Sequence, residues 1–302
     1  MKNLFRVARL RFLVVGMALF VLGSLWAVLL GAPFSLMRML LGYLVILPAQ
    51  LSVNFSNDYF DVGSDRPGQA TFISGGGGVL LEHPELREPV KWIALGMIIS
   101  SLGMGFVFLR AYGYPSWIFG FVVLGNLLGW YYSAPPFRLS QRGLGEVCYT
   151  FVAGVLVPGM GYLALRGTLD AGGLFFLPPL ILYGLACSLS VEIPDVEDDL
   201  LAHKGTWLVR MGRASGFTTI GWLLVAATAY FFLSPIFFPR QVWMDPRVLG
   251  VLSFLPLGVG IFGMLSRPLE RQAATKIATG IVIMLATFSL FVDGYLIYLA
   301  AQ

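Results

Sequence analysis

Charged side chains are scarce in this chain of 302 residues. Asp, Glu, Lys and Arg together make up 12% of it, while hydrophobic residues make up 57%. A soluble globular domain carries about 25% charged residues, and half that density cannot cover the surface of a water-soluble protein of this size. The composition excludes an ordinary soluble enzyme and a disordered chain. The net charge of +4 comes from scattered basic residues, so nucleic acid is not an expected partner.

Cysteine and histidine are equally sparse. Cys148 and Cys187 lie in apolar segments and cannot form a disulfide framework. His83 and His203 lack the spacing of metal ligands, and we interpret both as solvated loop residues. The sequence contains no nucleophile elbow, phosphate-binding loop or dinucleotide fingerprint. Any chemistry must therefore come from other groups.

Long apolar runs are abundant and predict an all-α, multi-pass transmembrane bundle. A membrane-spanning helix needs about 20 mostly apolar residues. Nine segments meet this description, at about 13–31, 35–56, 91–110, 115–134, 146–166, 172–191, 214–233, 247–265 and 276–300. We expect residues 1–302 to form a single integral-membrane domain.

The distribution of basic residues indicates the expected orientation in the membrane. Nine spans place the two termini on opposite sides, and the two sides carry unequal numbers of Lys and Arg residues. Of the 20 Lys and Arg residues, 15 fall on the side of the N-terminus. The other five are Arg38, Arg110, Arg166, Arg240 and Arg247. The positive-inside rule then makes the N-terminus cytoplasmic and the C-terminus non-cytoplasmic.

Half of the 16 acidic residues gather in two stretches, each at the end of a predicted span on the cytoplasmic side. The first acidic stretch, residues 57–65, reads NDYFDVGSD, and the second, residues 192–199, reads EIPDVEDD. Both contain acids at i, i+3 and i+7, namely Asp58, Asp61 and Asp65 in the first and Glu192, Asp195 and Asp199 in the second. On a helix this spacing aligns three side chains along one face.

Six carboxylates at one mouth of a bundle would repel one another unless a cation joined them. Asn57 adds an amide oxygen beside Asp61, and a site made of oxygen ligands alone selects hard cations, Mg²⁺ first when a phosphate is bound. Acids at helix ends are also found simply as solvated caps. Two stretches of equal spacing on one side favour the metal site.

Basic residues near these stretches suit a diphosphate. Arg66 follows the first stretch, Lys204 and Arg210 follow the second, and Arg138 lies in the central loop YYSAPPFRLSQRGLGE. The positive-inside rule alone also explains basic residues here. The loop after the first stretch contains Gly75–Gly78, which either binds phosphate through backbone N–H groups, acts as a lid or is a plain linker.

These motifs resemble the UbiA superfamily of intramembrane aromatic prenyltransferases. NDYFDVGSD resembles the N-D-x-x-D-x-x-x-D signature of that family, and EIPDVEDD followed by HKGTWLVRMG resembles its second acidic motif and trailing basic segment. YSAPPFRLSQRGLGE resembles its loop between spans four and five. With the nine-span plan, the resemblance covers nearly the whole chain.

The resemblance implies a membrane enzyme that transfers a prenyl group from a polyprenyl diphosphate to an aromatic acceptor with Mg²⁺. Its nine transmembrane helices would surround a central cavity that opens sideways to membrane lipid. By the same resemblance, Asn57, Asp58, Asp61, Asp65, Glu192, Asp195 and Asp199 would hold the metal, and Arg66, Lys204, Arg210 and Arg138 the diphosphate. Asp61 and Asp195 would be essential for catalysis, and Asp65 is the expected base. Tyr59, Tyr131, Tyr132 and Phe137 could stabilise an allylic cation or form an interfacial aromatic belt.

The acceptor is the least determined feature. The glycine-rich segment ending in GVL is similar to dihydroxynaphthoate prenyltransferases of menaquinone synthesis, whereas Glu192 and Pro194 depart from their usual pattern. Hydroxybenzoate, homogentisate, chlorophyllide and glycerol-phosphate lipid remain alternative acceptors. From other classes, a cation-coupled transporter and a non-catalytic scaffold stay open, although transporter sites usually lie near the middle of the membrane.

Overall fold

The computed structural model describes residues 2–63, 71–73, 78–238 and 244–302, and all regular structure in these ranges is helical. The α-helices are α1 (Lys2–Ala8), α2 (Arg11–Leu29), α3 (Leu36–Asp61), α4 (Val79–Glu82), α5 (Arg87–Tyr112), α6 (Trp117–Ser133), α7 (Gly145–Phe151), α8 (Val157–Arg166), α9 (Leu177–Glu192), α10 (Val196–Leu201), α11 (Trp207–Phe237), α12 (Pro246–Leu252), α13 (Phe254–Ser266) and α14 (Arg271–Ala300). Short 3₁₀ segments are η1 (Pro84–Leu86), η2 (Leu139–Gln141), η4 (Ala171–Leu174) and η5 (Ile193–Asp195), and a π-helix, η3 (Val152–Leu156), joins α7 to α8.

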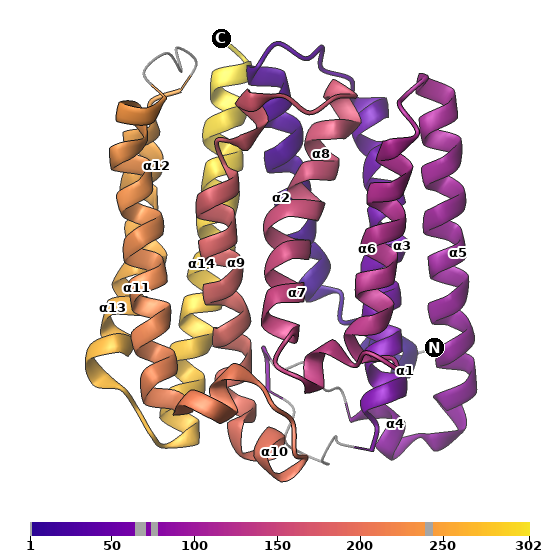
Figure 1. The fold of residues 1–302 in the computed structure, drawn as a ribbon, viewed down its shortest axis with the longest axis vertical. Helices are drawn as coiled ribbons and strands as arrows, with labels where there is room; N and C mark the ends of the chain where they lie inside the picture. Colours follow the sequence, from indigo (N-terminus) through magenta and orange to yellow (C-terminus); the bar gives the residue numbers. More distant parts are fainter. Residues whose placement is uncertain (1, 64–70, 74–77, 239–243) are drawn as a thin grey trace.

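The long helices stand side by side as a bundle, with α1, α4 and α10 at one end and the C-terminus at the other (Figure 1). Within the described residues, seven helical segments are long and apolar enough to cross a membrane, and α12 with α13, bent by 43°, could be an eighth. Helix α6 has 17 residues, fewer than the usual length of a span. The predicted all-α multi-pass bundle is confirmed, whereas the count of nine spans is not.

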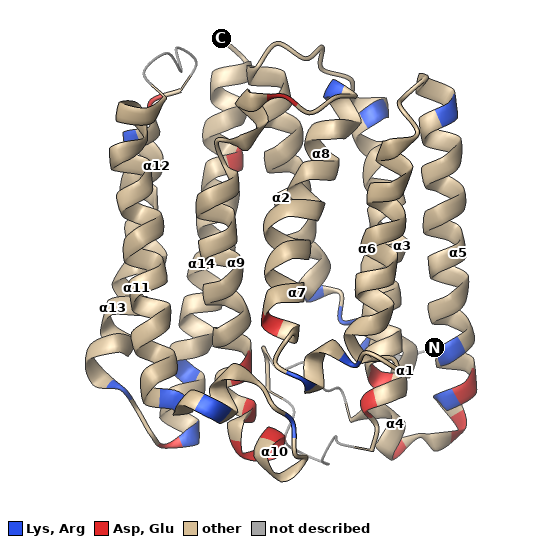
Figure 2. Cartoon of the chain, viewed as in Figure 1, with Lys and Arg blue, Asp and Glu red and all other residues tan. Residues whose placement is uncertain are grey.

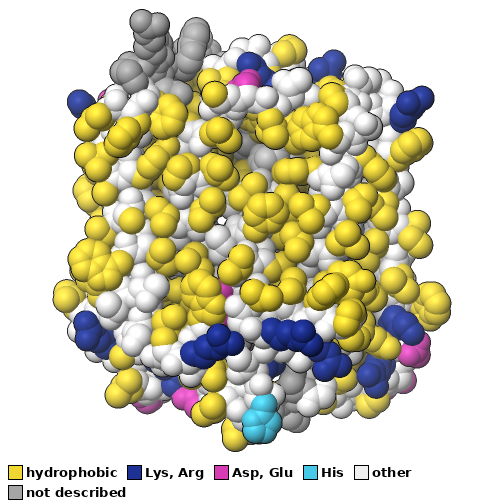
Figure 3. Space-filling view, viewed as in Figure 1, with side chains coloured by type: hydrophobic (Ala, Val, Ile, Leu, Met, Phe, Trp, Pro, Cys, Tyr) yellow, Lys and Arg dark blue, Asp and Glu magenta, His cyan; other side chains and the backbone are white. Residues whose placement is uncertain are grey.

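The outer surface is that of a protein surrounded by lipid. In the face shown in Figure 3, hydrophobic side chains form a broad middle band and basic side chains lie near its two ends. Large exposed apolar residues such as Phe106, Trp222 and Phe262 belong to such a surface. Most basic and acidic residues of the described chain gather at the end of α1, α4 and α10 (Figure 2). The charge asymmetry expected from the sequence is therefore present in the fold.

Helices α2 and α8 cross so closely that only glycine fits. A Cβ atom on Gly23 would lie 1.9 Å from the Pro158 carbonyl oxygen, and one on Gly161 would lie 2.0 Å from that of Phe20. The Ser24 hydroxyl donates to the Gly161 carbonyl at 3.0 Å across the same crossing. In a membrane the hydrophobic effect does not favour helix association, because lipid tails are as apolar as the side chains. Close packing of small residues and interhelical hydrogen bonds hold the helices together instead.

Candidate active site

A cavity of about 370 Å³ opens inside the bundle, mostly lined by apolar side chains from α2, α3, α6, α9 and α14 and from the α7–α8 region. Among its lining residues are Phe121, Leu156, Met160 and Leu285. Towards the charged end the lining becomes polar, with Arg9, Asn54, Asn57 and Tyr132. The cavity thus joins an apolar chamber to a polar mouth.

The first acidic stretch forms the last turn of α3 at this mouth. Asp58 and Asp61 are buried there, with 2% and 5% of their surfaces exposed. Ser133 at the end of α6 accepts a hydrogen bond from Asn57 Nδ2 at 3.2 Å and donates to Asp61 Oδ2 at 3.3 Å. The predicted helical face is confirmed for the described part of this stretch, and Ser133 fixes it to α6.

Arg9 is a site residue that the sequence analysis missed. It lies between α1 and α2 with a left-handed φ of 44°, which turns the chain and brings its guanidinium into a buried ion pair with Asp58. No sequence signal separated Arg9 from the other basic residues of the N-terminal tail. The pairing depends on the chain reversal at Arg9 itself.

The second acidic stretch is not the continuous helix that its spacing suggested. Helix α9 ends at Glu192, η5 follows, and α10 begins at Val196. Pro194 lies in η5, and a proline removes one backbone donor and prevents a regular α-helix from continuing. The three acids remain at the mouth, but on three successive segments.

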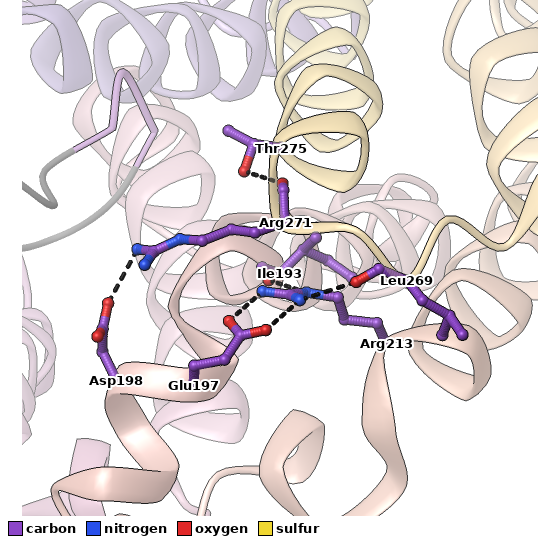
Figure 4. A network of polar contacts seen from close by, with 7 residues as sticks. All are labelled: Ile193, Glu197, Asp198, Arg213, Leu269, Arg271 and Thr275. Atoms are coloured by element: carbon purple, nitrogen blue, oxygen red, sulfur yellow. Dashed lines mark hydrogen bonds and ion pairs between the residues drawn. The ribbon is translucent and has the colours of Figure 1, made fainter.

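Two arginines hold the outer side of this stretch (Figure 4). Arg213 of α11 forms a two-pronged ion pair with Glu197 and also donates to the carbonyls of Ile193, at 2.9 Å, and Leu269, at 3.1 Å. Arg271 of α14 donates to Asp198 at 2.9 Å. Glu197 and Asp198 therefore form ion pairs on the outer side of the stretch, whereas Glu192, Asp195 and Asp199 lie at the mouth.

The two acidic stretches meet at the mouth. Asp61 interacts electrostatically with both Lys204 and Asp199, and Lys204 Nζ lies 3.0 Å from Asp199 Oδ1. The loop around η2 joins the two sides, because Gln141 donates from its side chain to Asp61 at 3.4 Å and accepts at its carbonyl from Gly205 N at 2.8 Å. The structure therefore brings together acids separated by more than a hundred residues.

Glu146 is a second buried charged residue that the sequence analysis missed. It is fully buried at the start of α7 and accepts a hydrogen bond from the backbone N–H of Trp207, the first residue of α11. Its carboxyl group also interacts with that of Glu192, next to Tyr132. Its position five residues after η2 ties the central loop to the second acidic stretch, and only its place in the loop GLGE could have drawn attention to it.

The other residues predicted to bind the diphosphate or to act as base and lid lie at the edge of the mouth, away from ion pairs, or outside the described residues. Arg210 is exposed and donates to the Arg142 carbonyl at 3.4 Å, at the edge of the mouth. Arg138 is exposed in the turn after α6 and makes no ion pair in the described part of the chain. Asp65, Arg66 and Gly75–Gly77 lie outside the described residues, so the predicted base and the glycine lid stay predictions.

Among the aromatic candidates, Tyr132 lines the cavity. Tyr59 instead packs against Phe60 and lies under the charged groups of Arg87 and Lys91. Tyr131 packs edge-on against Phe137, which is 52% exposed. Tyr132 is thus the aromatic residue of this group placed to face a bound substrate.

The donor chemistry of the mouth suits a hard cation. Asp58 Oδ2 and Glu192 Oε2 are buried without a hydrogen-bond partner in the described residues, and unpaired carboxylate oxygens are the ligands that Mg²⁺ takes. No three Asp, Glu, His or Cys side chains of the described chain already form a compact metal site. The residues therefore fit a metal that arrives with its own waters and a diphosphate.

Comparison with known proteins identifies the family. Residues 85–287 match the UbiA prenyltransferase family, and the chain belongs to this family. The match begins after the first acidic stretch and includes the second. The family predicted from the sequence motifs is therefore confirmed.

Curated relatives are distant. The chain is 26% identical over 236 residues to the chloroplastic 2-carboxy-1,4-naphthoquinone phytyltransferase of Arabidopsis thaliana, covering 74% of this chain and 55% of that protein. It is 28% identical over 169 residues to the probable homogentisate phytyltransferase 2 of Oryza sativa subsp. japonica, covering 52% of this chain and 44% of that one. The chain spans about half the length of these relatives.

Solved structures share the fold. A digeranylgeranylglyceryl phosphate synthase superposes with a TM-score of 0.68 at 14% identity, covering 100% of this chain and 99% of that one. A UbiA homologue from Archaeoglobus fulgidus, bound to GPP and Mg²⁺, gives 0.62 at 14% identity, covering 96% and 99%.

Proposed function

We propose that this chain transfers a polyprenyl group from a polyprenyl diphosphate to an aromatic acceptor in the presence of Mg²⁺. The observation that supports this most directly is the meeting of Asp61 with Asp199 and Lys204 at the mouth of an apolar cavity. An isoprenoid diphosphate has the matching shape, with a charged head for the mouth and a hydrocarbon tail for the chamber.

Different residues of the chain would bind the metal, bind the diphosphate and remove the proton. Asn57, Asp58, Asp61, Asp65, Glu192, Asp195 and Asp199 would hold Mg²⁺, which supplies Lewis-acid stabilisation of the leaving diphosphate. Lys204, Arg210, Arg66 and Arg138 would bind the diphosphate oxygens. The bond between the allylic carbon and the diphosphate oxygen breaks with its electron pair on oxygen, the ring carbon of the acceptor bonds to the allylic carbon, and Asp65 takes the ring proton.

The apolar chamber would protect this reaction. Its wall excludes water from an allylic carbon that gains cationic character, so the acceptor rather than water is alkylated. Tyr132, on the cavity wall near Glu192 and Asp61, could face that carbon with its ring.

For the acceptor we propose a dihydroxynaphthoate-type ring and a role in menaquinone or related quinone synthesis. Support comes from the GVL-ending glycine-rich segment and from the name of the Arabidopsis relative, a 2-carboxy-1,4-naphthoquinone phytyltransferase. We place the protein in the cytoplasmic membrane as one domain, with the mouth facing the cytoplasm, because most Lys and Arg residues lie at that end.

The test is direct transfer by the purified full-length protein in detergent. It would receive radiolabelled geranylgeranyl diphosphate, Mg²⁺ and, separately, 1,4-dihydroxy-2-naphthoate, 4-hydroxybenzoate or homogentisate. We expect a prenylated product that EDTA abolishes, formed fastest with the naphthoate. Absence of product with every acceptor, together with cation flux in liposomes, would overturn the proposal in favour of a transporter.

A further inference from the structure

A side-chain amide without a partner lies inside the cavity. Gln50 on α3 lines the cavity wall and makes no hydrogen bond with any described residue, and its Oε1 is fully buried. An amide inside a membrane protein that has neither water nor protein to bond costs free energy. Such a group is expected to have a partner that the chain itself does not supply.

Other amides on this wall are bonded within the chain. Asn54 Nδ2 donates to the Ala8 carbonyl at 2.7 Å, Asn57 Nδ2 to Ser133 at 3.2 Å, and Asn126 Nδ2 to Ser101 at 3.0 Å. These three bonds hold α3 to the N-terminal segment and to α6, and α6 to α5. Gln50 differs because it holds no helix in place.

Gly16 on the neighbouring helix α2 provides space for the Gln50 amide. A Cβ atom on Gly16 of α2 would lie 2.0 Å from Gln50 Nε2 and 2.8 Å from its Oε1. The amide therefore rests on the bare backbone of Gly16, at the edge of the cavity that both residues line. Rotation of the amide about its last bond exchanges donor and acceptor without moving the rest of the side chain.

The position of Gln50 relates it to the reacting end of the cavity. Asn57 lies seven residues further along α3, which on an α-helix is the same face and about 10 Å nearer the mouth. The wall between them, which includes Val53 and Asn54, also lines the cavity. Gln50 thus lies two helical turns inside the place where the diphosphate would bind.

The chemistry of the two substrates decides which of them could use this amide. A prenyl chain is a hydrocarbon with no hydrogen-bond donor or acceptor, so it gains nothing from Gln50. An oxygen-bearing aromatic ring has the hydroxyl or carbonyl group that an amide binds. Building on the proposed function, we propose that Gln50 is a specificity residue, which hydrogen-bonds a ring oxygen of the aromatic acceptor and orients the ring towards the allylic carbon.

The first test replaces the amide while keeping its length. In Gln50→Met we expect the KM for 1,4-dihydroxy-2-naphthoate to rise about two- to tenfold, the loss of one neutral hydrogen bond, with the KM for geranylgeranyl diphosphate unchanged. Gln272→Met makes the same exchange at an exposed position of α14 that does not line the cavity, so it should leave both constants unchanged. An equal rise of both constants in Gln50→Met would overturn the proposal.

A second test removes the partner from the ligand. Wild-type protein should bind the dihydroxynaphthoate more tightly than the mono-O-methyl ether in which the oxygen bonded by Gln50 is methylated. Gln50→Met should lose this discrimination. Gly16→Ala, which displaces the Gln50 amide without removing it, should lose part of this discrimination. Equal discrimination in wild type and Gln50→Met would show that Gln50 binds only cavity water and would overturn the inference while leaving prenyl transfer intact. Absence of all transfer in the wild type would instead contradict the proposed function.

Discussion

Arg9 and Asp58 form an ion pair inside the protein, with side chains only 5% and 2% exposed. Asp58 belongs to the acidic stretch expected to bind Mg²⁺, whereas Arg9 comes from the N-terminal segment that folds over the end of α3. A buried carboxylate needs a positive partner, and here the chain supplies one. Arg9 and a metal ion would therefore compete for Asp58, which makes the N-terminal segment part of the mouth.

Replacement of Arg9 should expose this competition. In Arg9→Met the Asp58 carboxylate loses its partner, so the thermal midpoint without metal should fall, in keeping with a cost of about 3–5 kcal/mol for breaking a buried pair. Added Mg²⁺ should then raise the midpoint more than it does in the wild type. Differential scanning fluorimetry in detergent, with and without Mg²⁺, measures both effects without requiring turnover.

Arg6 offers the matched control for this variant. Its pair with Glu82 joins the same two kinds of group, but the side chains are 47% and 54% exposed. Exposed pairs contribute little, so Arg6→Met should change neither the midpoint nor its response to Mg²⁺. If Arg9→Met responds to Mg²⁺ as the wild type does, Arg9 does not compete with the metal.

Asp61 is expected to be indispensable because it contacts both sides of the mouth. Asp61→Asn keeps the hydrogen bonds to Ser133 and Gln141 within reach but removes the charge that would bind Mg²⁺. Transfer measured with radiolabelled prenyl diphosphate should fall below detection, while expression and thermal midpoint stay close to wild type. Glu88→Gln, an exposed acid on α5, is the control and should remain active. An active Asp61→Asn enzyme would show that the metal assignment is wrong.

Sequence patterns predicted the parts of the fold that depend on local composition. Apolar runs located the helices, and the spacing of Asp58 and Asp61 placed both on the last turn of α3. The same rule failed at the second stretch, since Pro194 breaks the helix between Glu192 and Asp199. Spacing alone could not show this break because it counts residues and ignores whether the backbone can stay helical.

Tertiary partners could not be predicted. Arg9 reaches Asp58 only through a left-handed residue between two helices, and Glu146 meets Trp207 across 61 positions of sequence. Gln50 is a polar residue inside a predicted span, a feature that the sequence does show. Its lack of a partner became visible only when the neighbouring helices were in place.

The anchor of the second stretch should be essential for stability. Arg213→Met removes the pair with Glu197 and leaves the carbonyls of Ile193 and Leu269 without their donor. Because Glu197 is half exposed, we expect a loss of about 3 kcal/mol, the lower limit for breaking a buried pair, seen as a lower thermal midpoint in detergent. Arg267 is exposed, and among the described residues its guanidinium donates only to the Met264 carbonyl of its own helix end, so Arg267→Met should leave the midpoint unchanged. Equal midpoints for the two variants would mean that Arg213 is not an anchor.

The crossing of α2 and α8 gives a prediction about packing alone. Gly161→Ala would place a methyl group 2.0 Å from the Phe20 carbonyl oxygen, so the two helices must move apart and weaken the bond from Ser24 to residue 161. Overpacking of this kind costs about 1–3 kcal/mol, and the thermal midpoint should fall. Gly96→Ala on α5 makes the same exchange where no atom lies within 4 Å, and because alanine favours a helix over glycine, its midpoint should hold or rise. If Gly161→Ala is as stable as Gly96→Ala, the crossing is looser than the structure places it, and the cavity wall that α2 and α8 share is free to widen.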